Sequence, residues 1–405
     1  MRCGLLGEKL GHSYSPQIHA LLGEYDYALF EKDANELEHF LTGCEFQGLN
    51  VTIPYKKSVI PYCDRLSLEA QKLGAVNTIT RDPDGKLTGH NTDYYGFQYM
   101  LSKSMLALSG KKVLVLGSGG AAVTVFSVLK EAGAIPVMIS RNGENNYQNL
   151  HIHKDAAIIV NATPVGMYPN TGPTPIDIKQ FPLLEGALDL IYNPARTQFL
   201  LDAEENGLVA LNGLWMLIAQ AKKSAELFLN QTLPDNVIDS IYFKLSREMQ
   251  NTVLIGMPGC GKSTIGKLLA EMLGKKFIDA DQCVEKLAHK SIPEIFFSDG
   301  EAAFRAYETQ VLEDLGKKSG LVIATGGGCV TQAKNYPLLR QNSRIIWIKR
   351  DLNALPTEGR PISQNSSLQL IFEQRQPLYE KFADYAVEND DLPSVVAARI
   401  AALEV

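Results

Sequence analysis

The sequence lacks the features that would place it in a membrane, in an oxidising compartment or on nucleic acid. No apolar run approaches the roughly 18 residues that a membrane-spanning helix needs. The first residues, MRCGLLGEKLGHS, have neither the charged start nor the apolar core of a signal peptide. The six cysteines are scattered without a CxxC pair, which argues against a disulfide framework or a zinc site. The formal net charge of −6 gives no general reason to expect nucleic-acid binding. We therefore expect a cytoplasmic protein without nucleic-acid or membrane partners.

The composition and the order of patterned segments predict an α/β protein. Apolar residues make up 45% of the sequence and charged residues 21%, which is the balance of a globular protein with substantial cores. A length of 405 residues suggests two or three domains, at about 150 residues each. Strand-like and helix-like segments alternate almost throughout, as in folds with parallel sheets.

Two segments combine a strand, a glycine-rich turn and a helix. The first is KKVLVLGSGGAAVTVFSVLKEAG, and its helix is expected to bury Val125, Val128, Leu129 and Ala132. The second is NTVLIGMPGCGKSTIGKLLAEMLG, with a predicted buried stripe of Ile265, Leu268, Leu269, Met272 and Leu273. Between them, residues 229–250 are polar and less patterned, so this stretch is either a linker or a terminal helix pair. We place the main domain boundary near 245–250.

The second segment contains a phosphate-binding loop. Gly256, Gly261, Lys262 and Ser263 satisfy the pattern G-x-x-x-x-G-K-[ST]. Glycines allow successive backbone N–H groups to converge on phosphate oxygens, where a Cβ would obstruct them. Lys262 can reach the β- and γ-phosphates, and the hydroxyl of Ser263 can bind Mg²⁺. The sequence therefore predicts a site for a nucleoside triphosphate and indicates a small-molecule kinase.

A pair of carboxylates follows in FIDADQCVE, where Asp279 and Asp281 lie two positions apart at the expected end of a second strand. Alternate residues of an extended segment point in opposite directions, so the two side chains could serve different partners. One could hold Mg²⁺ or its water shell, and the other could bind a substrate hydroxyl. An isolated DxD is more often a solvated strand end, but its place after a phosphate-binding loop favours function.

Five ordered motifs, GMPGCGKSTIG, SDGEAAFRAYE, ATGGGCV, EGRPIS and EQRQPLY, resemble those of shikimate kinases over roughly residues 251–390. The resemblance implies that Asp279 lies on the Mg²⁺ side, as does Ser263, and that Asp281 binds the shikimate hydroxyls and accepts the proton. Arg305 and Arg375 would hold the substrate carboxylate, because guanidinium groups suit planar carboxylates. Glu308 would orient Arg305. The backbone of Gly326, Gly327 and Gly328 would close the pocket, and Arg360 would meet the transferred phosphoryl group from a mobile lid. The implied ATP contacts are Gly256, Gly259, Cys260, Gly261, Lys262, Ser263, Thr264 and Arg360.

The first strand–turn–helix segment indicates a dinucleotide site. Gly117, Gly119 and Ala122 match G-x-G-x-x-A, with Gly120 and Ala121 between them, which places a pyrophosphate at the start of the helix. The next strand ends at Ser140-Arg141-Asn142 rather than at an acidic residue. An arginine suits the 2′-phosphate of NADP, whereas an acidic residue would suit the ribose of NAD. A solvated loop cation is the alternative for Arg141.

Polar residues upstream could bind a small acid. In GHSYSPQIHA we expect Ser15 to be a helix N-cap, with Pro16 in the first turn, and the hydroxyls of Ser13 and Ser15 to bind a carboxylate. Capping without a ligand is the commoner role of such a motif. The segments NVTIPYK and NTD add Lys56 and Asp93, which could transfer a proton or form a structural salt bridge.

The ordered motifs HSYSP, NVTIPYK, GAVNT, NTD, GSGGA, NATPVGM and NGLWMLIAQA resemble shikimate dehydrogenases over about residues 1–230. The resemblance implies that Ser13 and Ser15 bind the carboxylate of 3-dehydroshikimate and that Lys56 and Asp93 are the catalytic pair. Thr52, Asn77, Asp93, Tyr192 and Gln220 would line the substrate, and Thr163, Met167 and Gly213 would border the nicotinamide. Two departures stand out: Trp215 replaces a frequent glycine and could alter nicotinamide seating, and a second basic residue after Arg141 is missing.

Together these motifs predict a bifunctional enzyme. Residues 1–100, joined by helices at about 212–245, would bind the substrate, residues 101–211 would form a Rossmann-type NADP domain, and residues 250–405 would form a P-loop kinase domain with a parallel sheet. The chain would reduce 3-dehydroshikimate with NADPH and then phosphorylate shikimate with Mg²⁺ and ATP, as a monomer or homodimer. Two alternatives remain: an NAD-dependent quinate or shikimate dehydrogenase fused to a kinase, and a non-catalytic metabolite-sensing regulator.

Overall fold

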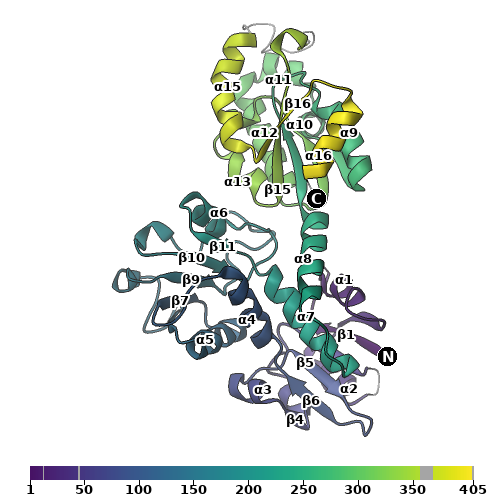
Figure 1. Ribbon diagram of the computed structural model, residues 1–405, viewed down its shortest axis with the longest axis vertical. Coiled ribbons are helices and arrows are strands. Elements are labelled where there is room, and N and C mark those ends of the chain that lie inside the picture. The colour runs from purple at the N-terminus through teal and green to yellow at the C-terminus, as the bar shows by residue number, and fades with distance from the viewer. Residues whose placement is uncertain (12, 44–45, 356–367, 404–405) are drawn as a thin grey trace. The chain divides into compact units, whose positions relative to one another are not determined.

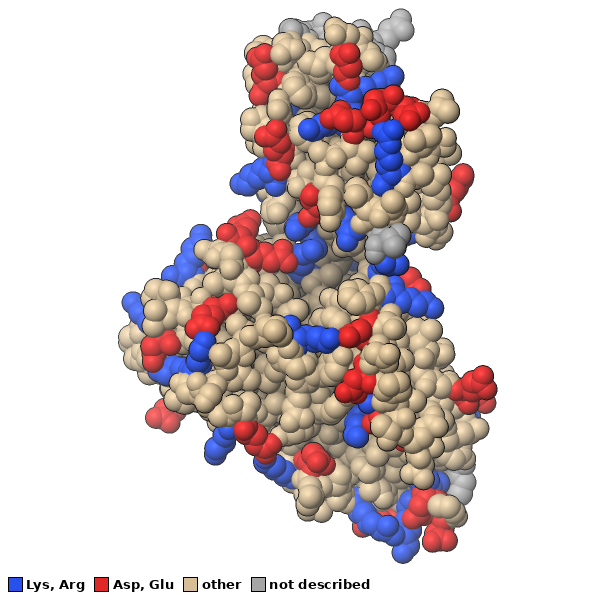
Figure 2. Space-filling view, viewed as in Figure 1, with Lys and Arg blue, Asp and Glu red and all other residues tan. Residues whose placement is uncertain are grey.

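The computed structural model describes residues 1–11, 13–43, 46–355 and 368–403, and it divides into two compact units. Unit 1 comprises residues 1–192 and 199–244, and unit 2 comprises residues 193–198 and 245–405. The predicted α/β fold is confirmed, since every sheet carries helices between its strands (Figure 1). Acidic and basic side chains are intermixed over the visible face of each unit (Figure 2). Among the described residues, no helix combines the length and the apolar character that crossing a membrane requires.

The first sheet of unit 1 is mixed and has the strand order β2-β1-β3-β5-β6-β4. Strand β1 runs parallel to β2 and β3, whereas β5 is antiparallel to both β3 and β6. Its strands are β1 (Arg2–Gly7), β2 (Asp26–Glu31), β3 (Gly48–Val51), β4 (Arg65–Leu66), β5 (Thr78–Arg81) and β6 (Leu87–His90). The helices of this part are α1 (Ser15–Ala20), η1 (Ala34–Glu36), α2 (Leu37–Thr42), η2 (Ile60–Tyr62) and α3 (Leu68–Leu73).

The second sheet of unit 1 is parallel, with the order β11-β10-β9-β7-β8. Its central strands are buried on both faces, which explains their continuous apolar sequences. The strands are β7 (Lys112–Leu116), β8 (Ile135–Ile139), β9 (Ile158–Asn161), β10 (Gly186–Asp189) and β11 (Val209–Leu211). The accompanying helices are α5 (Gly120–Glu131), η3 (Leu150–His153), η4 (Ile178–Gln180) and α6 (Gln198–Glu205). Strand order reverses at β7, which is where ligands bind in open α/β sheets.

Two packed helices, α4 (Asp93–Ser104) and α7 (Leu214–Leu229), complete unit 1 together with the part of α8 (Asn236–Met249) up to residue 244. The stretch 229–250, for which a linker was one expectation, is instead largely helical, because α7 ends at Leu229 and α8 runs over Asn236–Met249. Only Gln250 separates α8 from the first strand of the next sheet.

Unit 2 is built on a parallel five-stranded sheet with the order β13-β14-β12-β15-β16 and helices on both faces (Figure 1). The strands are β12 (Asn251–Ile255), β13 (Lys276–Asp279), β14 (Leu321–Ala324), β15 (Ser343–Lys349) and β16 (Tyr385–Glu388). The helices are α9 (Lys262–Leu273), α10 (Ala280–Ala288), α11 (Ile292–Ser298), α12 (Gly300–Gly316), η5 (Cys329–Thr331), α13 (Asn335–Arg340), η6 (Leu352–Ala354), α15 (Leu368–Phe382) and α16 (Pro393–Leu403).

Two of the predicted buried positions are wrong. Ala132 lies one residue beyond α5 and is exposed, because that helix has already ended at Glu131. Met272 lies on α9 but is 49% exposed, whereas Ile265 and Leu269 are fully buried. The apolar stripe of α9 is therefore narrower than the sequence indicates.

Candidate active sites

Lys56 and Asp93 meet in unit 1. The Nζ atom of Lys56 lies 2.6 Å from Oδ2 of Asp93. Asp93 is the first residue of α4, and its other carboxylate oxygen accepts a hydrogen bond from Nδ2 of Asn77 at 2.9 Å. The amide of Asn77 is oriented in turn, because its Oδ1 accepts the backbone N–H of Thr92 at 2.7 Å. The carboxylate is thus held on both oxygens, and the ammonium group of Lys56 remains partly exposed.

The other predicted substrate residues lie on neighbouring elements. The hydroxyl of Ser13 accepts the backbone N–H of Ser15 at 3.2 Å. The prediction that Ser15 is an N-cap is wrong: Ser15 is the first residue of α1, Tyr14 precedes it as the N-cap residue, and the side chain of Tyr14 makes no capping hydrogen bond. The rings of Tyr14 and Tyr192 lie edge to face at 6.0 Å, which brings Tyr192 beside the serine segment. Gln220 lies on α7, where its Oε1 is 3.5 Å from the hydroxyl of Thr92. Thr52 directly follows β3, and its side chain is half-buried.

The glycine-rich turn after β7 fits the pyrophosphate of a dinucleotide. Helix α5 begins at Gly120, and Gly119 as its N-cap residue offers no side chain to the first-turn N–H groups. A Cβ at Gly119 or Gly120 would meet no atom within 4 Å, so this cradle is open on the ligand side. Such a helix start attracts anions through its N–H groups and its dipole. Ala121 continues the first turn of the same helix.

The residues expected around the rest of the dinucleotide occupy the loops that follow β8, β9 and β11. Arg141 is exposed after β8, in a loop closed by the hydrogen bond from Ser140 N to the carbonyl oxygen of Asn145. The hydroxyl of Thr163 donates to Oδ1 of Asn161 at 2.7 Å, and Met167 is 46% exposed. Gly213 precedes α7, where any Cβ would clash with the carbonyl oxygen of Leu190.

Trp215 does not extend freely into a cleft, although its bulk suggested an effect on nicotinamide seating. Its indole is 7% exposed and stacks on Tyr242 of α8, with ring centroids 3.6 Å apart. The ammonium group of Lys103, on α4, lies 4.9 Å from the indole centroid. The extra volume at this position is therefore accommodated between α4, α7 and α8.

In unit 2 the phosphate-binding loop has the backbone that its sequence predicts. Gly256, Gly259 and Gly261 have backbone φ values of 144°, 82° and 100°, which residues other than glycine rarely adopt. The Nζ atom of Lys262 lies 2.9 Å from the carbonyl oxygen of Gly256, inside the loop. The loop leads into α9, whose first turn contains Ser263 and Thr264, and the buried Cys260 packs inside it. This arrangement fits the phosphates of a nucleotide.

The sequence suggested that the two aspartates lie on one extended segment, but the structure places them on different elements. Asp279 ends β13 and caps α10, and its Oδ1 accepts the backbone N–H of Asp281 at 3.1 Å. Asp281 lies within the first turn of α10, so the helix rather than strand alternation separates the two carboxylates. The hydroxyl of Ser263 donates to Oδ2 of Asp279 at 2.7 Å.

The Ser263–Asp279 pair is the part of unit 2 that fits a magnesium ion. Within the described ranges, no group of three or more His, Cys, Asp and Glu side chains could hold a metal by itself. A hydroxyl and one carboxylate do fit Mg²⁺, because this ion usually keeps several waters and takes further oxygens from phosphates.

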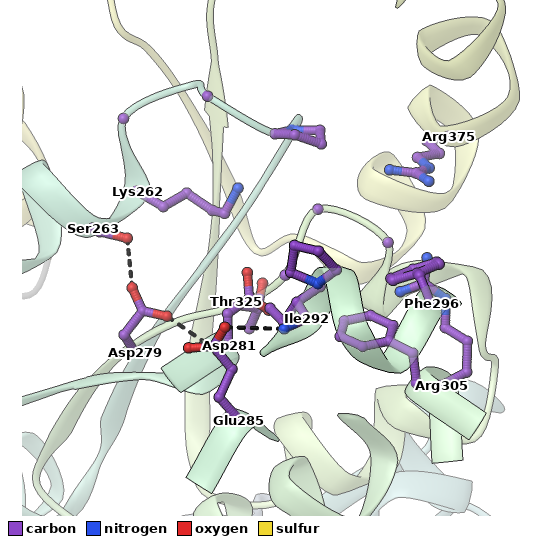
Figure 3. Close-up of a pocket in the computed structure, with 18 of the residues that line it drawn as sticks. Lys262, Ser263, Asp279, Asp281, Glu285, Ile292, Phe296, Arg305, Thr325 and Arg375 are labelled. Atoms are coloured by element: carbon purple, nitrogen blue, oxygen red, sulfur yellow. Dashed lines mark hydrogen bonds between the residues drawn. The ribbon is translucent and has the colours of Figure 1, made fainter. Parts of the chain in front are cut away.

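The predicted shikimate residues surround one cavity of about 600 Å³ that also opens onto the phosphate-binding loop. Figure 3 shows Lys262, Asp281, Arg305 and Arg375 around this space. Oδ1 of Asp281 is buried and has no hydrogen-bond partner among the described residues. Burial raises the pKa of the Asp281 carboxyl above its ordinary value, while the charge of Lys262 lowers it. Arg360 lies outside the described residues.

Arg305 is held by two glutamates of its own helix, α12. Its Nη1 lies 2.8 Å from the buried Glu308, as expected, and its Nη2 lies 3.1 Å from the exposed Glu301. Burial works against the charge of Arg305, but the two carboxylates raise its pKa above the ordinary value. The Gly326–Gly328 turn is packed against these groups, since a Cβ at Gly326 would lie 2.7 Å from both Asp281 Oδ1 and Glu308 Oε1.

Several residues at this site were given no role from the sequence. Ile292, Phe296 and Phe304 form an apolar wall of the cavity, but in the sequence they are indistinguishable from core residues. The hydroxyl of Tyr379 donates to the carbonyl oxygen of Gly327 at 2.5 Å. Arg350 lines this cavity and also a second one of about 620 Å³, in which Asn389 donates to the carbonyl oxygen of Cys260 at 2.8 Å.

Comparison with known proteins agrees with both resemblances. Residues 5–79 match the shikimate dehydrogenase substrate binding domain, and residues 258–404 match the shikimate kinase family. The shikimate dehydrogenase (NADP(+)) of Clostridium perfringens strain SM101 is 38% identical over 265 residues, which cover 60% of this chain and 97% of the relative.

Solved structures agree with the dehydrogenase resemblance. A chorismate mutase/shikimate 5-dehydrogenase fusion protein from Clostridium acetobutylicum is 40% identical, with a TM-score of 0.57 over 60% of this chain and 96% of that one. Shikimate 5-dehydrogenase from Thermus thermophilus, in complex with NADP(H) and shikimate, is 31% identical, with a TM-score of 0.56 over 60% of this chain and 99% of that one. The chain therefore belongs to the shikimate dehydrogenase family and joins that enzyme to a shikimate kinase domain in one polypeptide.

Proposed function

We propose that the chain catalyses two consecutive reactions: reduction of 3-dehydroshikimate to shikimate with NADPH, and phosphorylation of the 3-hydroxyl of shikimate with ATP and Mg²⁺. The observation that carries this proposal is that each unit gathers the charged groups its reaction needs. Lys56 and Asp93 pair at 2.6 Å in unit 1. In unit 2, Lys262, Asp281, Arg305 and Arg375 surround one cavity.

For the dehydrogenase, we propose that residues 1–100 and 212–245 bind the substrate and that residues 101–211 bind NADPH. The hydroxyls of Ser13 and Ser15 would hold the substrate carboxylate, with Thr52, Tyr192 and Gln220 around the ring. NADPH supplies the hydride when bound. The ammonium group of Lys56, held by Asp93, would donate a proton from Nζ to the carbonyl oxygen of the substrate as that oxygen becomes a hydroxyl. The carboxylate of Asp93 keeps Nζ aimed at the substrate.

For the kinase, residues 250–405 would hold shikimate between Asp281 and the two arginines. ATP supplies the phosphoryl group, with Mg²⁺ near Ser263 and Asp279. The guanidinium groups of Arg305 and Arg375 suit the substrate carboxylate, because both present planar pairs of N–H donors. Oδ1 of Asp281, which is buried without a partner among the described residues, is available to accept the proton of the attacking hydroxyl. The apolar wall formed by Ile292, Phe296 and Phe304 would keep water from the site.

The second cavity, beside Arg350 and Asn389, would accommodate the nucleoside part of ATP next to the phosphate-binding loop. Arg350 lines both cavities, and its Nη1 lies 3.4 Å from the carbonyl oxygen of Gly259. The side chain of Asn389, which lines the second cavity, donates a hydrogen bond to the carbonyl oxygen of Cys260 in the loop. We propose that the base and ribose occupy this space while the phosphates follow the loop.

The test is a two-step assay of the purified full chain. Given 3-dehydroshikimate and NADPH, the protein should consume NADPH and form shikimate, and addition of Mg²⁺ and ATP should then give shikimate 3-phosphate by mass spectrometry. Quinate with NAD, assayed in parallel, addresses the alternative dehydrogenase, and comparison of kcat/KM for NADPH and NADH measures the cofactor preference. Absence of both products at every pH tested would show that the proposal is wrong.

A further inference from the structure

Ser224, on α7, lies at a junction of four structural elements in unit 1. The residue is fully buried, and its Oγ lies 2.9 Å from the carbonyl oxygen of Gln220 on the same helix. The same oxygen lies 2.8 Å from Nδ2 of Asn50 on β3, 2.8 Å from Oγ1 of Thr78 on β5, and 3.0 Å from Oγ1 of Thr92 before α4. A single hydroxyl thus contacts the helix that carries Gln220 and both strands beside the Lys56–Asp93 pair.

The chemistry of these groups fixes most of the hydrogen-bond directions. A serine hydroxyl has one hydrogen and two acceptor positions. The carbonyl oxygen of Gln220 can only accept, so Ser224 donates its hydrogen there. The amide of Asn50 is oriented by Tyr27, whose hydroxyl donates to Oδ1 of Asn50 at 2.8 Å. Nδ2 of Asn50 therefore faces Ser224 and occupies one acceptor position.

One acceptor position of Ser224 remains for two threonines. Thr78 and Thr92 both lie within hydrogen-bond distance of it, at 2.8 Å and 3.0 Å, so the hydroxyl hydrogen of one of them fills this position. The hydroxyl hydrogen of the other threonine then turns to Oδ1 of Asn77, which lies 3.2 Å from both hydroxyl oxygens. Asn77 thereby keeps Oδ1 toward Thr92 and Nδ2 toward Asp93.

We propose that Ser224 is a positioning residue for the dehydrogenase reaction. By saturating its own hydrogen bonds with Asn50, Gln220 and one of the two threonines, it leaves the hydroxyl of the other threonine for Asn77, and Asn77 holds the Asp93 carboxylate that pairs with Lys56. This inference rests on the proposed reduction of 3-dehydroshikimate. Ser224 acts through neutral groups only, so it orients the carboxylate and exchanges no proton with the substrate.

If Ser224 had only a structural role, its substitution would lower the folded fraction without lowering kcat per folded molecule. Ser104 provides the matched control. Ser104 is also buried in unit 1, and its hydroxyl donates to the carbonyl oxygen of Leu101 at 2.7 Å and accepts the N–H of Leu106 at 3.2 Å. These partners belong to the end of α4, away from Asp93 at its start. Ser104→Ala therefore removes a buried hydroxyl from the same unit without touching the chain of groups that leads to Asp93.

The experiment compares Ser224→Ala, Ser224→Cys and Ser104→Ala in the full chain, with the fraction of folded unit 1 measured for each. The cysteine variant keeps nearly the volume of serine but is a weak hydrogen-bonding group, so it remains informative if the alanine variant fails to fold. Per folded molecule, we expect both Ser224 variants to lower kcat for 3-dehydroshikimate reduction roughly tenfold. The KM for NADPH and the rate of shikimate phosphorylation should stay unchanged, and Ser104→Ala should reduce with parental kcat.

Two results would overturn the inference. If Ser224→Cys loses no more activity per folded molecule than Ser104→Ala, Ser224 only supports the fold. If the KM for NADPH rises as much as kcat falls, the substitution has loosened the whole unit rather than the Asp93 carboxylate. The parental chain separates this failure from that of the proposed function: a parent that does not reduce 3-dehydroshikimate refutes the reaction itself, and the inference with it.

Discussion

Nζ of Lys56 lies 2.6 Å from Oδ2 of Asp93, although the two residues are 37 positions apart in the chain. Lys56 follows the end of β3, and Asp93 begins α4, so the fold of the first sheet brings the two charges together. Here the lysine side chain is 26% exposed, so its ammonium group can reach a ligand.

Replacement of Lys56 by methionine should therefore abolish reduction while sparing phosphorylation. General acid–base assistance contributes roughly 10²–10⁴ in rate, so we expect kcat for 3-dehydroshikimate reduction to fall by at least about 100-fold. Lys57→Met is the matched control, because Lys57 is adjacent and exposed. Both activities should be measured on the same preparations. Equal losses in the two variants, or a parallel loss of kinase activity, would contradict a catalytic role for Lys56.

The parts of the two sites that could be predicted are those that carry charge or an unusual backbone. Arg305, Arg375 and Asp281 line one cavity, as the shikimate kinase resemblance implied. Motif glycines with positive φ, such as Gly256 and Gly261, were predictable because few other residues adopt that conformation. The local sequence is sufficient to predict these positions, because the charge or the unusual backbone conformation is a property of the residue type itself.

The parts that could not be predicted depend on contacts between distant segments. Ser224 is one of several small residues on a buried helix, and only the meeting of α7 with β3 and β5 gives it its hydrogen bonds. Met272 fits the apolar stripe of α9 but is exposed. The helical spacing of apolar residues does not reveal how much of the helix surface the neighbouring sheet covers. Asp281 was expected on a strand end and lies on a helix, because Asp279 caps α10 and ends the strand two residues earlier.

The buried ion pair between Arg305 and Glu308 should control shikimate binding by unit 2. The Glu308 side chain is 1% exposed, so Glu308→Gln leaves a buried guanidinium without its main counter-charge. Breaking such a pair costs about 3–5 kcal/mol of stability. We expect the KM for shikimate to rise roughly tenfold or more, because the guanidinium loses its orientation. Steady-state kinetics should be combined with urea unfolding of unit 2, followed by Trp347 fluorescence in a Trp215→Phe background.

Glu301→Gln is the matched control for that substitution. Glu301 contacts the same guanidinium at 3.1 Å, but its side chain is 57% exposed. Exposed ion pairs contribute about 0–1 kcal/mol, so this variant should change neither stability nor the KM for shikimate appreciably. If the two glutamine variants behave alike, burial of Glu308 does not matter to the site.

The hydroxyl of Tyr379 should matter for the substrate side of the kinase and little for the nucleotide. It donates to the carbonyl oxygen of Gly327 at 2.5 Å and therefore holds the glycine turn that borders the cavity. Loss of one buried hydrogen bond costs about 1–3 kcal/mol, so Tyr379→Phe should raise the KM for shikimate roughly tenfold. Tyr385→Phe, at a 44% exposed tyrosine on β16, is the control. A larger effect on the KM for ATP than on that for shikimate would argue against this role.

His19 should make unit 1 sensitive to acid. The ring is 1% exposed, stacks on Tyr27 with centroids 4.0 Å apart, and its Nδ1 lies 2.6 Å from the hydroxyl of Tyr25. Burial lowers the pKa of His19 from 6.5 to about 3. Between these values the unfolded chain binds a proton that the folded unit does not, so this contribution to stability is present above about pH 6.5 and is lost progressively as the pH falls.

The expected loss attributable to His19 between pH 7 and pH 5 is about 2 kcal/mol, at about 1.4 kcal/mol per pH unit below the unfolded pKa. Urea unfolding at the two pH values, followed by Trp215 fluorescence in a Trp347→Phe background, should show this loss in the parent. His19→Gln should remove it and leave the remaining pH dependence intact. His39→Gln, at an exposed histidine on α2, should behave as the parent does. Identical pH dependence in the parent and in His19→Gln would mean that His19 is protonated, or accessible to protons, in the folded unit.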